Sequence, residues 1–340
     1  MKTALTFDDI QLIPNYSEIH TRQSVSLRTS VSKNYSLEVP LIAAPMDTVC
    51  GSEMAIVMMG IGGVGCLHRF CSVSQQVEMV LKVKTYKQKH LYYEPIMAAI
   101  GATGDYYERA IHLVNAGVDI LVIDVAHGHH LNVKEALQKL KSNLPSHVNI
   151  IAGNVATKQG ALDLEAWGAD GLRVGIGGGS LCTTRIQTGF GVPNITAIEE
   201  MAGVVNIPLM IDGGIRSSGD IAKALAVGAD CAMVGSLLSG TTQTPNDLVE
   251  INGKQYKSYR GLASLDTKLI HNQQTRNVEG ESTLVLYKGC AEDVLQELIE
   301  GLQSALSYGG SFTIGQFQST VKYNVVTSAG LKEARPHLIQ

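Results

Sequence analysis

Eight short runs of mostly aliphatic residues recur along the chain and constrain its fold more than any other feature. They lie at positions 41–44, 63–67, 96–101, 120–125, 149–155, 171–176, 208–214 and 231–238. They lack the alternation of polar and apolar residues that marks a half-exposed strand, so we expect strands buried on both faces. Helix-like stretches such as 105–117, 158–170 and 218–230 separate them. This alternation predicts a parallel α/β fold.

The placement of polar residues distinguishes a closed barrel from an open, doubly wound sheet, which alternation alone would equally allow. Seven polar residues lie at or just beyond the C-terminal ends of the runs: Asp47, His68, Asp124, Asn154, Ser180, Asp212 and Ser236. A barrel gathers these ends on one face, whereas an open sheet would spread several of them along an edge. We therefore predict an α/β protein with a single (β/α)₈ barrel over residues 1–340, an N-terminal extension and a C-terminal flap.

Composition excludes several classes of protein. The net charge is −4 and no block of Lys and Arg occurs, which argues against a nucleic-acid partner. Apolar runs stay shorter than a membrane span, and Asp8 and Asp9 interrupt the N-terminal segment before any signal-like apolar stretch. The six cysteines stand singly, so neither a zinc site nor a disulfide framework is favoured. We expect a cytoplasmic protein that does not bind a membrane.

Two motifs carry less weight than their letters suggest. Residues 60–65 read GIGGVG and match the dinucleotide fingerprint GxGxxG. They follow a helix-like stretch and precede a strand, which is the reverse of the required order, so we interpret them as a turn that opens a strand. His127, His129 and His130 could suggest a metal site, but no cluster of carboxylates or cysteines accompanies them in the sequence.

Glycine pairs and a glycine-rich loop mark candidate binding turns. Gly213-Gly214 ends the seventh run and Gly235-Ser236 lies in the eighth. Barrels commonly bind phosphate after these two strands through backbone N–H groups. Asp212 could accept hydrogen bonds from ribose hydroxyl groups or cap the next helix, and spacing leaves both open. Residues 175–193 form a second candidate, a loop without the GK[ST] ending of a Walker A motif. Its Cys182 could be structural or nucleophilic.

These segments also resemble a known family. Residues 175–198 are similar to the cysteine loop of IMP dehydrogenases and the related GMP reductases. Further segments resemble the same family in the same order: LTFDDIQLIP, LIAAPMDTV, IDVAHGHH, IIAGNVAT, IDGGIRSSGDIAKALAVGA, MVGSLL and SYRGLASLD. The forms APMDTV, AHGH and GSLL favour the dehydrogenase branch. The resemblance implies NAD-dependent oxidation of IMP to XMP. The alternatives are NADPH-dependent reduction of GMP to IMP, or a nucleotide-binding homologue without turnover.

The resemblance also implies roles for individual residues. Cys182 would attack C2 of the hypoxanthine ring, and Thr184 would orient the water that hydrolyses the adduct. The residues that would hold the purine nucleoside monophosphate are Met46, Ser180, Asp212, Gly213, Gly214, Gly235, Ser236, Tyr259, Gly261 and Glu279. Those on the dinucleotide side are Asp124, Asn154 and Gly175. Backbone carbonyl groups of Gly177, Gly179 and Cys182 would coordinate a potassium ion. A homotetramer is also implied.

Three departures from the family pattern affect these expectations. The paired CBS module is missing, because residues 68–83 run almost directly into the third strand. The family's GPGS is here Gly-Gly-Gly-Ser at 177–180, which removes a restricting proline and predicts a looser loop. The flap, about 264–289, lacks both the Arg-Tyr pair of the dehydrogenases and the glutamate of the reductases. Arg276, the sole arginine between Ser264 and Glu279, is then the candidate to activate water.

Overall fold

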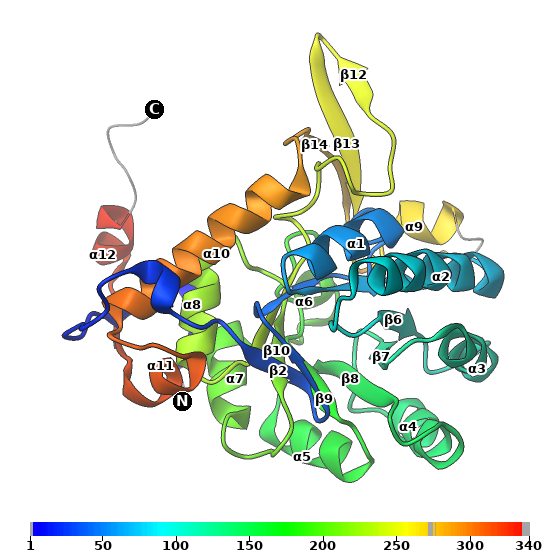
Figure 1. The fold of residues 1–340 in the computed structure, drawn as a ribbon, viewed down its shortest axis with the longest axis horizontal. Coiled ribbons are helices and arrows are strands. Elements are labelled where there is room, and N and C mark those ends of the chain that lie inside the picture. The colour runs from blue at the N-terminus through cyan, green and yellow to red at the C-terminus, as the bar shows by residue number, and fades with distance from the viewer. Residues whose placement is uncertain (1–2, 271–274, 276, 335–340) are drawn as a thin grey trace.

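The computed structural model describes residues 3–270, 275 and 277–334. Eight parallel strands close into a barrel in the order β10-β11-β4-β5-β6-β7-β8-β9 (Figure 1). They are β4 (Leu41–Ala43), β5 (Val64–Leu67), β6 (Met97–Ile100), β7 (Ile120–Asp124), β8 (Asn149–Val155), β9 (Gly171–Val174), β10 (Leu209–Asp212) and β11 (Cys231–Val234). Each strand falls within one of the eight apolar runs, which confirms the predicted (β/α)₈ barrel.

Helices follow the strands and surround the barrel (Figure 1). They are α1 (Ser52–Gly60), α2 (Val73–His90), α3 (Tyr106–Ala116), α4 (Leu131–Asn143), α5 (Lys158–Ala166), α7 (Asn194–Met201), α8 (Ser218–Ala226) and α10 (Ala291–Tyr308), with the short α6 (Thr184–Thr188) before α7. Glycines 117, 168 and 228, with φ of 113°, 107° and 109°, stand at or just past the ends of α3, α5 and α8. The GIGGVG segment joins α1 to β5, which confirms it as a turn that opens a strand.

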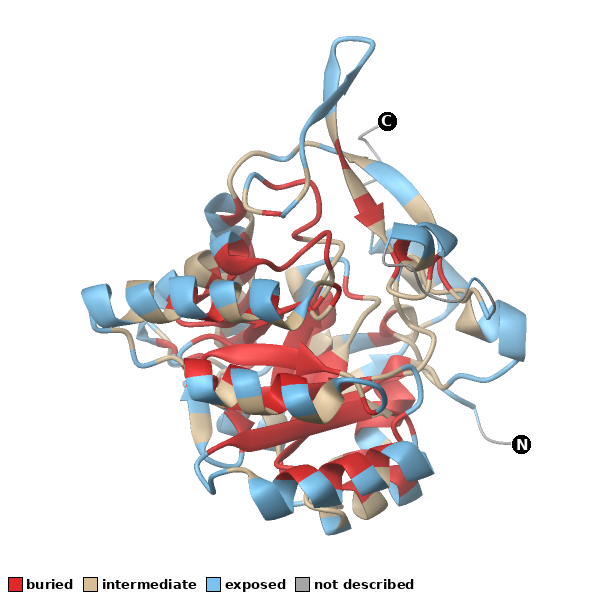
Figure 2. Ribbon diagram, turned by 90° about the vertical axis from the view of Figure 1, so that its right-hand side faces the viewer, coloured by how far each residue is buried: buried red, intermediate tan, exposed pale blue. Residues whose placement is uncertain are grey.

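Buried apolar side chains form two clusters, one inside the barrel and one between its strands and helices. Figure 2 shows the barrel strands coloured as buried and the outer faces of the helices as exposed. A hairpin of β2 (Thr29–Ser32) and β3 (Tyr35–Leu37) adds Val31 and Leu37 to the inner cluster. The hairpin also hydrogen-bonds to Asn149 and Asp230, next to the starts of barrel strands. It therefore covers the amino-terminal end of the barrel, and the opposite end stays available for a site.

Three aspartates tie neighbouring strands together near that covered end. Asp119, Asp170 and Asp230 each precede a strand, and each carboxylate accepts a hydrogen bond of 2.8 Å from a backbone N–H at the start of the preceding strand. Asp119 and Asp170 also pair with lysines. Burial raises the pKa of Asp230 to about 6. Each aspartate completes a Gly-Ala-Asp or Gly-Val-Asp triplet at a helix-to-strand junction.

Between β11 and α10 the chain leaves the barrel and forms a projecting finger (Figure 1). The finger is an antiparallel sheet of β12 (Val249–Ile251), β13 (Lys254–Arg260) and β14 (Ser282–Leu286). Helix α9 (Leu265–Ile270) lies between β13 and β14 in the chain, inside the predicted flap. The remaining elements are η1 (Phe7–Asp9), β1 (Ile10–Ile13), η2 (Arg22–Ser24), α11 (Ile314–Thr320), β15 (Lys322–Val325) and α12 (Ser328–Glu333). Strands β1 and β15 pair, so a segment near the start of the chain lies beside one near its end.

Candidate active site

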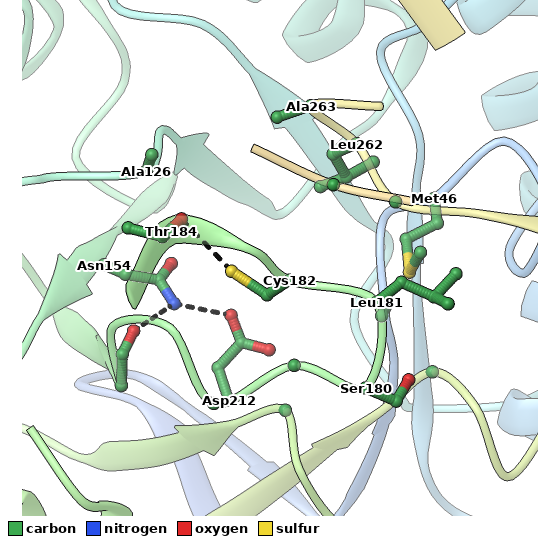
Figure 3. Close-up of a pocket in the computed structure, with 18 of the residues that line it drawn as sticks. Met46, Ala126, Asn154, Ser180, Leu181, Cys182, Thr184, Asp212, Leu262 and Ala263 are labelled. Atoms are coloured by element: carbon green, nitrogen blue, oxygen red, sulfur yellow. Dashed lines mark hydrogen bonds between the residues drawn. The ribbon is translucent and has the colours of Figure 1, made fainter. Parts of the chain in front are cut away.

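A cavity of about 370 Å³ lies at the carboxyl ends of the barrel strands. The predicted site residues that line it are Met46, Asp124, Asn154, Gly175, Gly177, Gly179, Ser180, Cys182, Thr184, Asp212, Gly213, Gly214, Gly235, Ser236, Tyr259, Gly261 and Glu279. Arg276 lies outside the described residues. Figure 3 shows several of these side chains converging on one space from separate loops. The barrel therefore gathers the described candidates in one place.

The glycine-rich turns lie directly against one another. A Cβ atom added to Gly213 would lie 3.1 Å from the Cα atom of Gly179, and one added to Gly214 would lie 2.6 Å from the carbonyl oxygen of Gly178. Gly213 and Gly214 also have positive φ angles of 79° and 74°, so both space and backbone conformation require glycine there. The two loops thus place closely spaced backbone groups beside the cavity, which suits an anion.

Hydroxyl groups complete this side of the cavity. The Oγ atom of Ser180 and the phenolic oxygen of Tyr259 lie 3.2 Å apart. Tyr259 is buried, and burial raises the pKa of its hydroxyl group, although the bond to Ser180 opposes the shift. A Cβ atom at Gly235 would lie 3.3 Å from this same oxygen. The neutral hydroxyl groups and the glycine backbone can therefore all face one phosphate group.

Cys182 begins a chain of hydrogen bonds that ends at a carboxylate. Its Sγ atom donates to the Oγ1 atom of Thr184 at 3.1 Å, and this hydroxyl donates to Oε2 of Glu279 at 2.7 Å. Figure 3 shows the side chains of Cys182 and Thr184 pointing toward each other. A thiol connected to a carboxylate through a hydroxyl has a path for losing its proton. The same path can accept a proton from a water molecule at the thiol.

The flap residues 279–281, just before β14, hold the cysteine loop in place. The backbone N–H of Thr183 donates to the carbonyl of Glu279, and that of Glu281 donates to the carbonyl of Leu181, both at 3.0 Å. Cys182 and Gly280 form the antiparallel bridge between these two bonds. The position of Cys182 therefore depends on the flap segment that carries Glu279.

Arg173 is a site residue that the sequence analysis missed. It lies in β9 with a side chain only 4% exposed, and its guanidinium pairs with Asp124 and Asp212. Burial opposes its charge, but the two carboxylates outweigh this effect and raise the pKa of Arg173 above the usual value. Asp212 also accepts a 2.7 Å bond from Asn154 (Figure 3). The signal was present, because an arginine inside an apolar strand requires a buried partner.

Two more ion pairs border the cavity. Arg69 lies beside Asp124, with Nε 3.6 Å from Oδ2 and Nη2 donating to the Asp124 carbonyl at 3.1 Å. Arg260, at the end of β13, donates from Nη2 to Oδ2 of Asp47 at 2.9 Å. Because Arg260 adjoins Tyr259 in the chain, this pair fixes the base of the finger over the barrel mouth. Sequence order alone gave no hint of these pairings.

The ends of the cysteine loop are joined by Arg185. Its guanidinium donates to the carbonyls of Ile176 at 3.3 Å and Val192 at 2.9 Å. The Gly179 carbonyl, one of the predicted potassium ligands, accepts a 3.1 Å bond from the Cys182 N–H and retains its second lone pair. The loop is therefore braced without the missing proline, and its carbonyl groups remain able to face a cation.

Two of the three histidines after β7 contact groups of the protein itself. His129 bonds to Asp163 at 2.8 Å, and His130 caps the start of α4. No group of three or more residues suited to a metal ion occurs in the described part of the chain. The helices of that part also include none with the length and apolar character needed to cross a bilayer.

Comparisons with known proteins agree with this geometry. The sequence profile of the IMP dehydrogenase / GMP reductase domain matches residues 4–337. Inosine-5'-monophosphate dehydrogenase of Borreliella burgdorferi is 39% identical, over 99% of this chain and 97% of that protein. The enzyme of the same name from Cryptosporidium parvum is 40% identical, over 99% and 95%. A crystal structure of GMP reductase from Trypanosoma brucei with guanosine 5'-monophosphate has a TM-score of 0.92 at 28% identity, covering 99% of this chain and 98% of that one. The chain therefore belongs to the IMP dehydrogenase / GMP reductase family.

Proposed function

We propose that the protein oxidises IMP to XMP with a nicotinamide dinucleotide, through a covalent adduct on Cys182. The hydrogen-bonded series Cys182–Thr184–Glu279 beside a glycine-rich anion cradle carries this proposal. The two dehydrogenases named above, each about two-fifths identical to the chain over nearly its full length, support the direction of the reaction.

The nucleotide phosphate lies against the glycine turns and the hydroxyl groups of Ser180, Ser236 and Tyr259. Asp212 accepts hydrogen bonds from the ribose hydroxyl groups. It does not cap the next helix, because Ser217 is the N-cap of α8. The base extends toward Met46, Gly261 and Glu279, which line the other side of the cavity, and its C2 atom then faces Cys182. This arrangement uses all the nucleotide-side residues that were predicted from the sequence.

The first half of the reaction forms a bond between Cys182 and the base. The thiol passes its proton through Thr184 to Glu279, and the thiolate adds to C2. C2 then loses its hydrogen with the bonding electron pair as a hydride, which oxidises the base and leaves a thioimidate on the sulfur. When bound, the oxidised dinucleotide supplies the hydride acceptor.

The second half of the reaction releases the product. Glu279 first releases to solvent the proton that it took from the thiol. Water then adds to C2 of the thioimidate, and one of its protons passes to the Thr184 hydroxyl group as that group donates its own to Glu279. The C2–S bond then breaks, XMP leaves, and the thiolate is restored. Thr184 and Glu279 thus supply an acceptor for the water proton without the Arg-Tyr pair. Arg276 stays a second candidate for this role.

The dinucleotide side of the cavity offers a fitting acceptor. Oδ2 of Asp124 is buried and has no hydrogen-bond partner among the described residues. A ribose hydroxyl group can satisfy it, and Asn154 and Gly175 line the same cavity. We propose NAD as the dinucleotide, or NADP if the reaction is reductive.

Reduction of GMP to IMP is the second candidate, supported by the GMP reductase whose fold this chain shares. The same cysteine would add to C2 of GMP, and ammonia would leave with a proton from the Thr184–Glu279 pair. A hydride from NADPH would then replace the amino group. A homologue that binds nucleotides without turnover is the remaining alternative.

An absorbance assay at 340 nm tests the direction of the reaction. The purified protein is offered IMP with NAD⁺ in one cuvette and GMP with NADPH in another. We expect absorbance to rise in the first and stay constant in the second. A fall in the second alone would establish the reductase, and constant absorbance in both would establish a binder without turnover.

We also propose one catalytic domain over 1–340, with the cysteine loop at about 175–193, the flap at about 264–289 and no CBS module. Helix α2 and residues 91–96 fill most of the chain between β5 and β6, where that module would be inserted. The proposal also includes a potassium ion, which would bind to the backbone carbonyl groups of Gly177, Gly179 and Cys182. It further includes a homotetramer and a cytoplasmic location. Activity with and without potassium and mass measurement by light scattering test the first two.

A further inference from the structure

Consecutive barrel strands bring Arg173 and its two partners together by register. Asp124 of β7 pairs with Gly153 of β8, and Gly153 pairs with Arg173 of β9. A Cβ atom at Gly153 would lie 2.5 Å from the Cβ atom of Arg173, so a side chain there would collide with the arginine. Glycine at 153 therefore leaves a gap through which the guanidinium reaches across β8 to Asp124.

The guanidinium of Arg173 forms ion pairs with two carboxylates at the same time. Its Nη1 atom donates to Oδ1 of Asp124 at 2.6 Å, and its Nη2 atom donates to Oδ2 of Asp212 at 2.7 Å. The side chains of Asp124 and Asp212 are only 6% and 14% exposed, so solvent screens these ion pairs weakly. A change of charge or position at one carboxylate must therefore alter the pairing of the other.

The two carboxylates face different ligands if the proposed function holds. Asp212 lies beside the glycine turns of the nucleotide side, and Asp124 lies beside Arg69 with its Oδ2 atom lacking a hydrogen-bond partner among the described residues. Arg173 is the one guanidinium bonded to both carboxylates in the described structure. It lines the cavity wall between them.

We infer that Arg173 is a positioning residue that couples the two halves of the active site. The inference rests on the proposed function, in which Asp212 holds the nucleotide and Asp124 faces the dinucleotide. Asp124 can then alter nucleotide affinity through the guanidinium that it shares with Asp212. Coupling free energies between sites are reciprocal, so nucleotide binding alters dinucleotide affinity by the same factor.

The substitution Asp124→Asn tests this coupling in the absence of any dinucleotide. It removes the competing charge, so Arg173 pairs more strongly with Asp212, whose oxygen becomes a poorer acceptor for the ribose. We expect the Kd for IMP, measured by calorimetry, to rise about fivefold or more. The bare loss of a negative charge would instead favour a phosphate-bearing ligand, so weaker binding identifies the route through Arg173.

The same substitution is then made in an Arg173→Lys protein. Lysine keeps the positive charge but cannot bridge two carboxylates as a planar fork, so Asp124→Asn should change the Kd less than about twofold there. Asp163→Asn is the matched control, because it removes the charge of another paired carboxylate, which contacts His129 and does not line the cavity. It should leave the Kd within about twofold in both backgrounds. Thermal melts of each variant establish that it is folded.

Three results would overturn the inference, and they are distinguishable. An equal effect of Asp124→Asn in both backgrounds would show that Arg173 does not carry the coupling. Unchanged or tighter binding in the Arg173 background would show that the two halves are independent. A parent protein that binds neither IMP nor GMP would overturn the proposed function itself, and the coupling with it.

Discussion

Replacing Glu279 by glutamine tests whether the hydrogen-bonded series at Cys182 performs hydrolysis. The amide preserves the size of the side chain and can still accept the 2.7 Å bond from Thr184, but it cannot accept the water proton. Loss of a positioned general base costs roughly 10²–10⁴ in rate, or about 3–5 kcal/mol in activation free energy. Because the thiol can also lose its proton directly to solvent, hydride transfer should be affected much less than hydrolysis.

Rapid mixing of the Glu279→Gln protein with IMP and NAD⁺ separates the two steps. We expect a burst of absorbance at 340 nm near one equivalent per site, followed by steady-state turnover slowed about a hundredfold or more. Mass spectrometry should then show the nucleotide adduct on Cys182. Glu281→Gln is the control, because this exposed neighbour should leave both phases unchanged. Normal steady-state turnover of the Glu279→Gln protein would refute the reasoning. If Arg276→Ala slowed hydrolysis instead, Arg276 would be the residue that accepts the water proton.

Four further outcomes are expected. Cys182→Ala should abolish turnover while nucleotide affinity, measured by calorimetry, stays within about tenfold; activity that survives would exclude the covalent route. IMP should bind about a hundredfold more tightly than inosine, since charge-assisted bonds contribute ~1.5–3 kcal/mol each; equal affinities would exclude the phosphate cradle. Arg260→Ala should weaken IMP binding about tenfold, because Asp47 no longer fixes the finger beside Tyr259, and an unchanged Kd would contradict this. Burial raises the pKa of Asp230 from 3.8 to about 6, so its ionised form destabilises the fold above about pH 6, and this penalty disappears as the pH falls toward 4. Asp230→Asn should therefore increase the free energy of unfolding at pH 8 by up to about 3 kcal/mol, seen as a higher melting temperature, and should not do so at pH 4. Equal effects at the two pH values would contradict this.

The architecture was predictable because its physical signals are local. Aliphatic runs without alternation indicate doubly buried strands, and glycines 117, 168 and 228 end their helices by a backbone conformation that disfavours other residues. Polar residues at the ends of the runs then pointed to the correct face of the barrel. The sequence also located Cys182 and the glycine turns that line the cavity, because glycine density around a thiol is visible without coordinates.

Pairings across the barrel could not be predicted in the same way. The contact of Arg173 with Asp124 and Asp212 depends on strand register, which a run of aliphatic residues does not specify. The Thr184–Glu279 bond joins residues 95 positions apart, through a flap whose path follows no periodic pattern. Sequence alone could place each residue at the cavity, but it could not show which side chains would share a proton or a charge.

The flap is anchored at both ends and can vary between them. The backbone N–H of Glu279 bonds to the Ala263 carbonyl at 3.1 Å, and Ser264 forms a bridge with Gly280. These bonds do not depend on how long the segment between Ser264 and Glu279 is, so we expect that this length can differ while the anchor beside Cys182 stays fixed. Groups that activate water could then be gained or lost in this segment without any change to the cysteine loop. A longer segment with an Arg-Tyr pair could be grafted between Ser264 and Glu279. Its arginine would then replace the proposed Thr184–Glu279 pair as the group that activates water.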